Sequence, residues 1–469
     1  MTILWHTKIK NLDYYFDQPD TRVYVRDLAH QGPLLIREAA ERGIKIYHYK
    51  ATRRSNKVQW LWHYSKGKRD CPTVLKIQLS NNCWLLDYTL FDPDEEVTEE
   101  EMEPVVRLLH EQYNDPITGC HVIKQLVRPG IASLVDLKPG IEAENYNMFQ
   151  QAMRGGANCI LNYDLIPYET HIDYHQMYAY VMTHFDFPAL NAKLEPGYYP
   201  HPFAIYRIYT GKAQLKENGY PMLASKCGSY MAGANGEVFD IARELGCLSD
   251  PDLKLLFKHY NVYSLTISET LYYNITFKGE DEFHNVTQEL YKGRQGATGA
   301  LKRFYKLMNE YMAGYFERSM KTGLRWTTFD KPDSTKIQVS RKNPKVGIFI
   351  LAYARQMLDR LLDMLPREKV IGYDTDAVFF AGKPEDIPEI IHRHCGPNMG
   401  QFHFDAVLKD VFHVASKHYY GYDLEKGEEF HKCSGVSKNG QVRKWNKETL
   451  EYELKEVQYE KRQFTLSME

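Results

Sequence analysis

The chain has 469 residues, which is too long for one ordinary hydrophobic core, so we expect two or three domains. At 43% hydrophobic and 26% charged residues, and with no apolar run near the roughly 20 residues of a membrane span, the composition is that of a soluble globular protein. The formal net charge of −2 does not by itself indicate a nucleic-acid binder, although 59 basic and 61 acidic residues can gather on separate surfaces. The eight cysteines are scattered without a Cys-x-x-Cys pair, which favours a reduced, intracellular protein.

The first 145 residues predict one α/β domain. A Thr98-Glu99-Glu100-Glu101 capping box opens a helix that runs to about Gln112. The other expected elements are a strand at 23–25, a helix over 33–42 closed by Gly43, and strands at 59–64 and 73–79.

The sequence changes in character from Arg154 onward. A strand and a helix lead into a stretch over 188–290 that we expect to be long and irregular. A helix from about Thr298, a basic loop, a second helix and a hairpin around residue 374 follow.

Two aspartates lie at the predicted hairpin. Apolar residues flank the short polar centre Tyr373-Asp374-Thr375-Asp376 and predict two buried strands joined by a tight turn. Carboxylates at i and i+2 lie about 6–7 Å apart on an extended chain, which lets divalent ions bridge them with a third ligand. A polar β-turn with solvated aspartates is the alternative.

A third carboxylate, Asp173, ends an apolar strand, and Tyr178 follows on the opening turn of a predicted helix. One strand could supply this ligand while a neighbouring hairpin supplies Asp374 and Asp376. The alternative is a helix N-cap aspartate ahead of a core helix.

These segments resemble family B DNA polymerases, with the best match to the protein-primed polymerases of phages and linear plasmids. Asp173-x-x-x-Met177-Tyr178 is similar to motif A, and Tyr373-Asp374-Thr375-Asp376 to motif C. Further matches, in the family's order from about residue 150 onward, are Arg154-Gly155-Gly156 (a Tyr-x-Gly-Gly element with Met153 in place of its Tyr), the helix from Pro344 to Arg355, Lys417-His418-Tyr419 (a Lys-x-Tyr motif) and Lys432-Cys433-x-Gly435 near the thumb.

The resemblance implies an α/β (α+β) right-hand fold of palm, fingers and thumb behind an RNase-H-like, degenerate 3′–5′ exonuclease domain. The implied boundaries are 1–145 for the exonuclease-like domain and 146–469 for the polymerase domain. Within the latter, they are palm 146–190 and 344–425, a terminal-protein-region insertion 188–290, fingers 291–316, a second insertion 317–343, and thumb 426–469.

The resemblance also implies the roles of site residues. Asp173, Asp374 and Asp376 would be catalytic and, with the backbone carbonyl of Tyr174, would hold two Mg²⁺ or Mn²⁺ ions. Tyr178 would be the gate that excludes a ribose 2′-hydroxyl. The implied nucleotide-binding cations are Arg294, Lys302 and Lys306, and the implied DNA-binding residues are Arg154, Gly155, Gly156, Lys417 and Tyr419.

Two motifs depart from the family pattern. The fingers motif Asn-Ser-x-Tyr-Gly is represented by Glu310-Tyr311-Met312-Ala313-Gly314, which keeps only the glycine, so we expect weaker nucleotide binding or lower fidelity. In the exonuclease motifs, Gln31 and Leu108 replace metal-binding aspartates and Pro104 replaces a tyrosine, so we expect no proofreading.

The implied function is template-directed addition of dNTPs to a primer 3′-hydroxyl or to a terminal-protein hydroxyl. The implied partners are primer-template DNA, dNTPs and a terminal protein. We expect a monomer that makes no membrane contact, in the cytoplasm, or in the host cytoplasm for a viral protein. Two alternatives remain: a catalytically idle nucleic-acid-binding relative, and a primase or translesion polymerase on the same scaffold.

Overall fold

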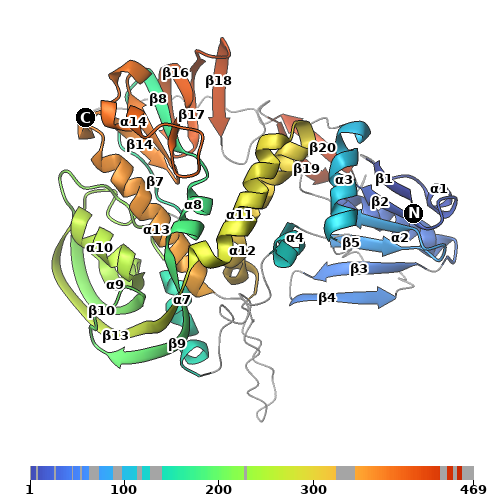
Figure 1. Cartoon of the computed structure of the whole chain (residues 1–469), viewed down its shortest axis with the longest axis horizontal. Coiled ribbons are helices and arrows are strands. Elements are labelled where there is room, and N and C mark those ends of the chain that lie inside the picture. The colour runs from blue at the N-terminus through green and yellow to red at the C-terminus, as the bar shows by residue number, and fades with distance from the viewer. Residues whose placement is uncertain are drawn as a thin grey trace. The chain divides into compact units, whose positions relative to one another are not determined.

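The computed structural model describes residues 2–6, 9–25, 28–44, 46–52, 55–62, 73–87, 98–113, 119–126, 140–226, 230–323, 344–433, 441–446 and 451–456. Figure 1 shows the helices and strands along the chain. The chain divides into two compact units. The first comprises Met1–Leu108, Lys417–Tyr420 and Glu429–Glu469, and the second comprises Leu109–Ser416 and Gly421–Glu428. The first division along the chain therefore falls after Leu108, whereas the predicted domain boundary lies near residue 145. The functional names given to the domains stay predictions.

A six-stranded mixed sheet organises the first unit, in the order β1-β2-β6-β5-β3-β4. The first two pairings are parallel and the other three are antiparallel. Helix α2 packs on β5 and β6 over a core that includes Tyr15, Val23 and Leu85. The elements are β1 (Thr2–His6), α1 (Leu12–Phe16), β2 (Thr21–Val25), α2 (Leu28–Glu41), β3 (Tyr47–Thr52), β4 (Ser55–Trp62), β5 (Thr73–Gln78), β6 (Trp84–Asp87), the first part of α3 (Glu99–Tyr113), and the hairpin β19 (Gln441–Asn446) and β20 (Glu451–Glu456).

The local predictions for this unit are confirmed. The expected strands overlap β2, β4 and β5, although residues 63 and 64 lie outside the described residues, and the helix expected over 33–42 overlaps α2, which ends at Glu41. The capping box forms as the sequence indicates, because the Glu101 backbone N–H donates to Thr98 Oγ1 over 3.2 Å and the Thr98 N–H donates to Glu101 Oε2 over 2.9 Å.

A second sheet lies in the second unit. Its order is β16-β8-β15-β14-β7, and all four pairings are antiparallel. Strands β17 and β18 extend the strand order beyond β16. Helix α13 packs against β15 and α8. The bounds are β7 (Asn158–Ile160), β8 (Ile166–Tyr174), α8 (Met177–His184), α13 (Pro344–Asp363), β14 (Val370–Asp374), β15 (Ala377–Ala381), β16 (Phe402–Ala415), β17 (His418–Asp423) and β18 (Glu428–Cys433).

The expectation of an irregular stretch over 188–290 is wrong, because this region forms a five-stranded sheet in the order β11-β10-β13-β9, with β12 paired to β10. Figure 1 shows its long strands curving around α9 and α10. Strand β13 is rich in tyrosine and β-branched residues, which favour strands, whereas the polar residues between them obscure the alternation. The bounds are β9 (Asp186–Pro196), β10 (Ala204–Leu215), β11 (Phe239–Asp240), α9 (Ile241–Glu244), β12 (Cys247–Ser249), α10 (Asp250–His259) and β13 (Tyr260–Lys278).

Two long helices, α11 (Gly279–Gly296) and α12 (Gly299–Gly323), follow this sheet and pack side by side. The helix expected from Thr298 is therefore confirmed, and most of the basic loop at 317–343 lies outside the described residues. No helix in the described ranges is long and apolar enough to cross a membrane. The remaining elements are α4 (Gly119–Leu126), α6 (Ile141–Glu144), α7 (Tyr146–Ala152), the 3-10 helices η1 (Arg367–Lys369) and η2 (Pro384–Asp386), and α14 (Glu389–Arg393).

Candidate active site

Asp173 lies at the end of β8, between two partner strands. The register places Ala377 of β15 opposite Asp173 on one side and His403 of β16 opposite it on the other. Because Ala377 directly follows Asp376, this pairing brings the second half of the aspartate hairpin to Asp173. The Tyr174 N–H donates to the Asp376 carbonyl over 3.2 Å and fixes the alignment.

The hairpin turn between the two aspartates has a fixed and unusual backbone. Thr375 has a φ of 64°, a left-handed conformation that β-branched residues rarely adopt. Three hydrogen bonds hold it: the Thr375 N–H donates to the Ala157 carbonyl (2.7 Å), its hydroxyl to Asp374 Oδ1 (3.0 Å), and the Asp376 N–H to the Asp374 carbonyl (2.7 Å). A Cβ atom at Gly156 would lie 2.8 Å from Thr375 Cγ2, so the glycine makes room for this turn.

The electrostatics around Asp173 favour a cation. Burial raises the pKa of Asp173 to about 8, and the negative charge of Asp376 adds to the rise, while His403 opposes it. The His403 Nε2 atom lies 3.9 Å from Asp173 Oδ2 and 3.8 Å from Asp405 Oδ1. Among the described residues, the buried Asp173 Oδ1 atom has no hydrogen-bond partner. A divalent ion would satisfy this oxygen and offset the repulsion between the two carboxylates.

The donor set is smaller than the sequence predicts. In the ranges that the structure describes, no three His, Cys, Asp or Glu side chains gather closely enough to hold a metal ion, so Asp173, Asp374 and Asp376 do not form such a group. One Asp374 oxygen instead accepts the Thr375 hydroxyl. The residues that fit a metal ion are therefore the Asp173 and Asp376 pair, with the Tyr174 carbonyl as a further predicted donor.

A cavity of about 320 Å³ opens beside Asp173 and Asp376. It gathers most of the residues predicted to bind the nucleotide, from β8, α8, α11 and α12, whereas Asp374 and Lys302 lie outside its lining. The lining residues are Asp173, Tyr174, His175, Gln176, Met177, Tyr178, Ala179, Arg294, Lys306, Asn309, Glu310, Asp376, His403 and Asp405.

Sequence reasoning missed five polar residues of this cavity. These are His175 and Gln176, at variable positions of the Asp173–Tyr178 motif, and Asn309, His403 and Asp405, which belong to no motif used in the prediction. The rings of His175 and His403 stack, with 3.9 Å between the ring centroids and an interplanar angle of 8°. The neighbouring carboxylates of Asp405 and Asp173 raise the pKa of His403. A signal existed only for His175 and Gln176, since they lie between Asp173 and Tyr178.

The side chain of Arg154, predicted to bind DNA, is buried. It is 2% exposed, and its guanidinium donates to the backbone carbonyls of Ala152, Ala224 and Leu245. Burial lowers its pKa to about 10. Because the guanidinium is buried and bonded inside the fold, a direct contact between this side chain and DNA is excluded. The prediction for Arg154 was based on the resemblance of its motif, which does not show where the side chain lies.

The other residues predicted to bind DNA lie in varied surroundings. Gly155 is exposed, and its carbonyl accepts from Arg355 Nη1 over 2.7 Å. Lys417 adopts a left-handed φ of 63° at the turn after β16. The ring of Tyr419 is 1% exposed and lies under Lys432 Nζ, which is 5.7 Å from the ring centroid. Their role in DNA binding stays a prediction.

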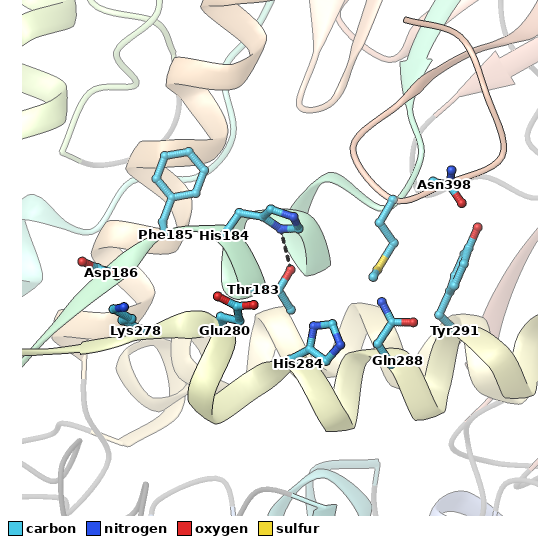
Figure 2. Close-up of a pocket in the computed structure, with 11 residues that line it drawn as sticks. Thr183, His184, Phe185, Asp186, Lys278, Glu280, His284, Gln288, Tyr291 and Asn398 are labelled. Carbon is cyan, nitrogen blue, oxygen red and sulfur yellow. Dashed lines mark hydrogen bonds between the residues drawn. The ribbon is translucent and has the colours of Figure 1, made fainter.

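A larger cavity, of about 460 Å³, lies at the other end of α8. Figure 2 shows its lining, in which His184 and Thr183 face side chains of α11 and Asn398, and a hydrogen bond of 2.8 Å joins Thr183 Oγ1 to His184 Nδ1. The Tyr291 hydroxyl of α11 donates to the Pro397 carbonyl beside it. None of the predicted site residues lines this cavity, so the smaller one is the candidate active site.

Comparison with solved structures shows that the fold is similar to that of phi29 DNA polymerase. The chain is similar to phi29 DNA polymerase complexed with primer-template DNA and incoming nucleotide substrates, at a TM-score of 0.66 and 17% identity over 91% of this chain and 86% of that one. It is also similar to the same polymerase complexed with single-stranded DNA, at a TM-score of 0.65 and 18% identity over the same shares. No family model and no curated protein sequence matches the chain. At this identity the likeness shows the fold alone.

Proposed function

We propose that the protein is a template-directed DNA polymerase that adds dNTPs to a primer 3′-hydroxyl or a terminal-protein hydroxyl. The observation that carries the proposal is the cavity in which Asp173 and Asp376 meet Tyr178, Arg294 and Lys306. Paired carboxylates, two cations and an aromatic ring in one cavity are what a deoxynucleoside triphosphate needs for its metal-bound phosphates and its sugar. Two bound Mg²⁺ or Mn²⁺ ions would neutralise the triphosphate and lower the pKa of the attacking hydroxyl.

The chain's own groups have separate tasks in this reaction. The primer oxygen forms a bond to the α-phosphorus while the α–β phosphoanhydride bond breaks and pyrophosphate leaves. Asp173 and Asp376 would hold the ions, with Asp374 fixing the turn between them. Arg294 and Lys306 would orient the triphosphate, and Lys302 would reach it from the same helix as Lys306. Tyr178 would stack under the sugar and exclude a 2′-hydroxyl.

Primer extension tests the proposal. A primed template with dNTPs and Mg²⁺ should be extended by the wild-type protein, while Asp173→Asn should reduce extension by at least about 1,000-fold because it removes half of the carboxylate pair. NTPs, and templates without a primer, separate a primase from a primer-dependent polymerase. Binding of primed DNA without any extension would instead favour a catalytically idle relative.

Glu310 is the residue that favours the alternative function, a catalytically idle nucleic-acid-binding relative of the polymerases. It lines the cavity one helical turn after Lys306, and a carboxylate there opposes the approach of a triphosphate. We propose that it weakens nucleotide binding, and Glu310→Asn should then lower the KM for dNTPs. We further propose that the protein lacks proofreading and that its primer is a terminal protein.

A further inference from the structure

Two partly buried side chains with buried amide atoms line the candidate nucleotide cavity. Gln176 lies three residues after Asp173 and two before Tyr178, and Asn309 lies three residues after Lys306 on α12. The oxygen and the nitrogen of both amides are buried, and neither amide has a hydrogen-bond partner within the described part of the chain. These two side chains come from segments more than a hundred residues apart and converge on one space.

Such amides are exceptions in native proteins, since nearly all buried polar side chains are hydrogen-bonded. An unsatisfied amide destabilises the folded state because it loses its bonds to water and gains none. Two unsatisfied amides in one cavity lower the stability of the ligand-free protein, and a bound molecule that hydrogen-bonds them can offset that loss.

The position of Gln176 is fixed by the surrounding backbone. It adopts φ 49° and ψ 53°, a left-handed conformation that is costly for a residue other than glycine. The flanking chain is held on both sides, because the His175 N–H donates to the Gln401 carbonyl (2.8 Å) and the Tyr180 N–H to the Gln176 carbonyl (3.0 Å). The amide therefore enters the cavity from a preset position.

We propose that Gln176 and Asn309 are specificity-determining residues whose amides hydrogen-bond the incoming deoxynucleoside triphosphate, an inference that rests on the proposed polymerase function. Each amide offers two N–H donors and a carbonyl acceptor, which match phosphate oxygens and a sugar hydroxyl. Arg294 and Lys306 in the same lining supply the charge that the triphosphate needs, and the amides supply neutral, directional contacts.

Near-isosteric apolar variants give a test with two readouts. Gln176→Met and Asn309→Leu remove the unsatisfied amides, so the unfolding temperature of the ligand-free protein should rise or stay equal. Equilibrium binding of the next templated dNTP, with Mg²⁺, to a complex of the protein and a dideoxy-terminated primer-template should weaken about tenfold in each variant. Gln288→Met, in the lining of the larger cavity, is the matched control and should leave nucleotide binding unchanged.

Each other result overturns the inference. Binding within twofold of the wild type in both variants would show that the amides do not touch the nucleotide. Weaker dNTP binding together with a lower unfolding temperature would show that the two amides stabilise the fold and do not contact the nucleotide. A wild-type protein that neither binds dNTPs nor extends primers would defeat the proposed function itself, whereas a wild type that does both alongside equally active variants would defeat only this inference.

Discussion

Tyr178 is the residue that most directly connects the cavity to a choice of substrate. It lines the cavity from the first turn of α8, and its sequence neighbours Met177 and Ala179 line the same cavity. Its place there follows from the end of β8 at Tyr174, because the chain needs only the two turn residues His175 and Gln176 before the helix starts.

The first prediction concerns this ring. Tyr178→Val should admit ribonucleotides, and the ratio of kcat/KM for dNTP over NTP should fall by about 100-fold, since a cavity without the ring rejects an added hydroxyl poorly. Single-nucleotide incorporation measured with both substrates checks it. An unchanged ratio would remove the gate role, and Tyr180→Val, on the same helix, serves as the control.

The second prediction concerns the repulsion between Asp173 and Asp376. Because the charge of Asp376 raises the pKa of Asp173, Asp376→Asn should relieve that repulsion and stabilise the metal-free protein by about 0.5–2 kcal/mol at pH 8. The same variant should lose primer extension. Thermal unfolding in the presence of a chelator, and again with Mg²⁺, provides the measurement: Mg²⁺ should stabilise the wild type more than the variant. A variant less stable than the wild type in chelator would contradict the electrostatic account.

Much of this site was accessible from single residues and their neighbours in sequence. Asp173, Asp376 and Tyr178 stand in short motifs, and those motifs led to the same cavity that the structure contains. His403 and Asp405 could not be found in that way, because their place depends on the register of β16 against β8, which is set by contacts more than two hundred residues apart in sequence. Arg154 shows the opposite failure, since its motif suggested a contact with DNA and the fold buries its side chain.

At the scale of elements, one buried ion pair ties α13 to α10. Arg355 of α13 is 1% exposed and binds Asp252 of α10, which is 0% exposed, through two contacts of 2.9 Å. Its third nitrogen donates to the carbonyls of Arg154 (3.0 Å) and Gly155 (2.7 Å). The pair therefore joins α10, the helix before the aspartate hairpin, and the glycine segment.

The third prediction tests this pair. Arg355→Met should lower the free energy of unfolding by about 3–5 kcal/mol, because it leaves the Asp252 carboxylate buried without its partner. Urea unfolding measures the loss. The double variant with Asp252→Leu should recover part of it, since the uncompensated charge is then gone. A loss below about 1 kcal/mol in the single variant would show that the pair is not needed.

A second cluster between α10 and α13 gives a pH dependence. Burial raises the pKa of Asp359, but hydrogen bonds from His259 (2.8 Å) and Lys258 (2.7 Å) outweigh it and hold the pKa below its ordinary value of 3.8. A carboxylate with a depressed pKa in the folded state stabilises the fold above its unfolded-state value and loses that contribution as the pH falls.

The fourth prediction follows from that sign. Asp359→Asn should lower the free energy of unfolding at pH 7 by about 1–3 kcal/mol, and the difference from the wild type should shrink as the pH falls through 3.8. Denaturant unfolding at pH 7, 5 and 3 measures it. Asp363→Asn, whose side chain also binds Lys258 but is 55% exposed, is the control and should have a small effect. A difference that grows toward acid pH would refute the assignment.

Secondary structure could be predicted where a local signal stood alone. The capping box at Thr98 and the apolar strands around the aspartates were sufficient, since each depends on residues close in sequence. The sheet over 186–278 was missed because β10 and β13 alternate poorly and contain register shifts, which hide the two-residue period.

At the scale of the whole molecule, the polymerase fold covers 91% of the chain although only 17% of the aligned residues are identical. Conservation of a fold at this level depends on the pattern of buried positions rather than on their identities. The few short motifs were therefore more informative than the similarity of the whole sequence, because no family model matches the chain.

The fifth prediction belongs to this scale. If the N-terminal unit is a degenerate exonuclease, the wild-type protein should not digest a mismatched 3′ end in Mg²⁺. The Asp376→Asn variant should also leave the mismatched end intact, because the substitution does not change the N-terminal unit. Leu108 stands at one of the expected metal positions, and a leucine offers no oxygen ligand. Release of single nucleotides from a labelled mismatched primer, persisting in Asp376→Asn, would refute the prediction.

The contact between Gly156 and Thr375 has a mechanical consequence. Arg355 holds the carbonyl next to Gly156, and Gly156 in turn leaves no space above the Thr375 side chain. Asp252, Arg355, the Gly155 carbonyl and Gly156 therefore form a continuous series of contacts from α10 to the turn between the two aspartates. A methyl group added at position 156 would collide with the Thr375 side chain and disturb the turn that sets the spacing of the two aspartates.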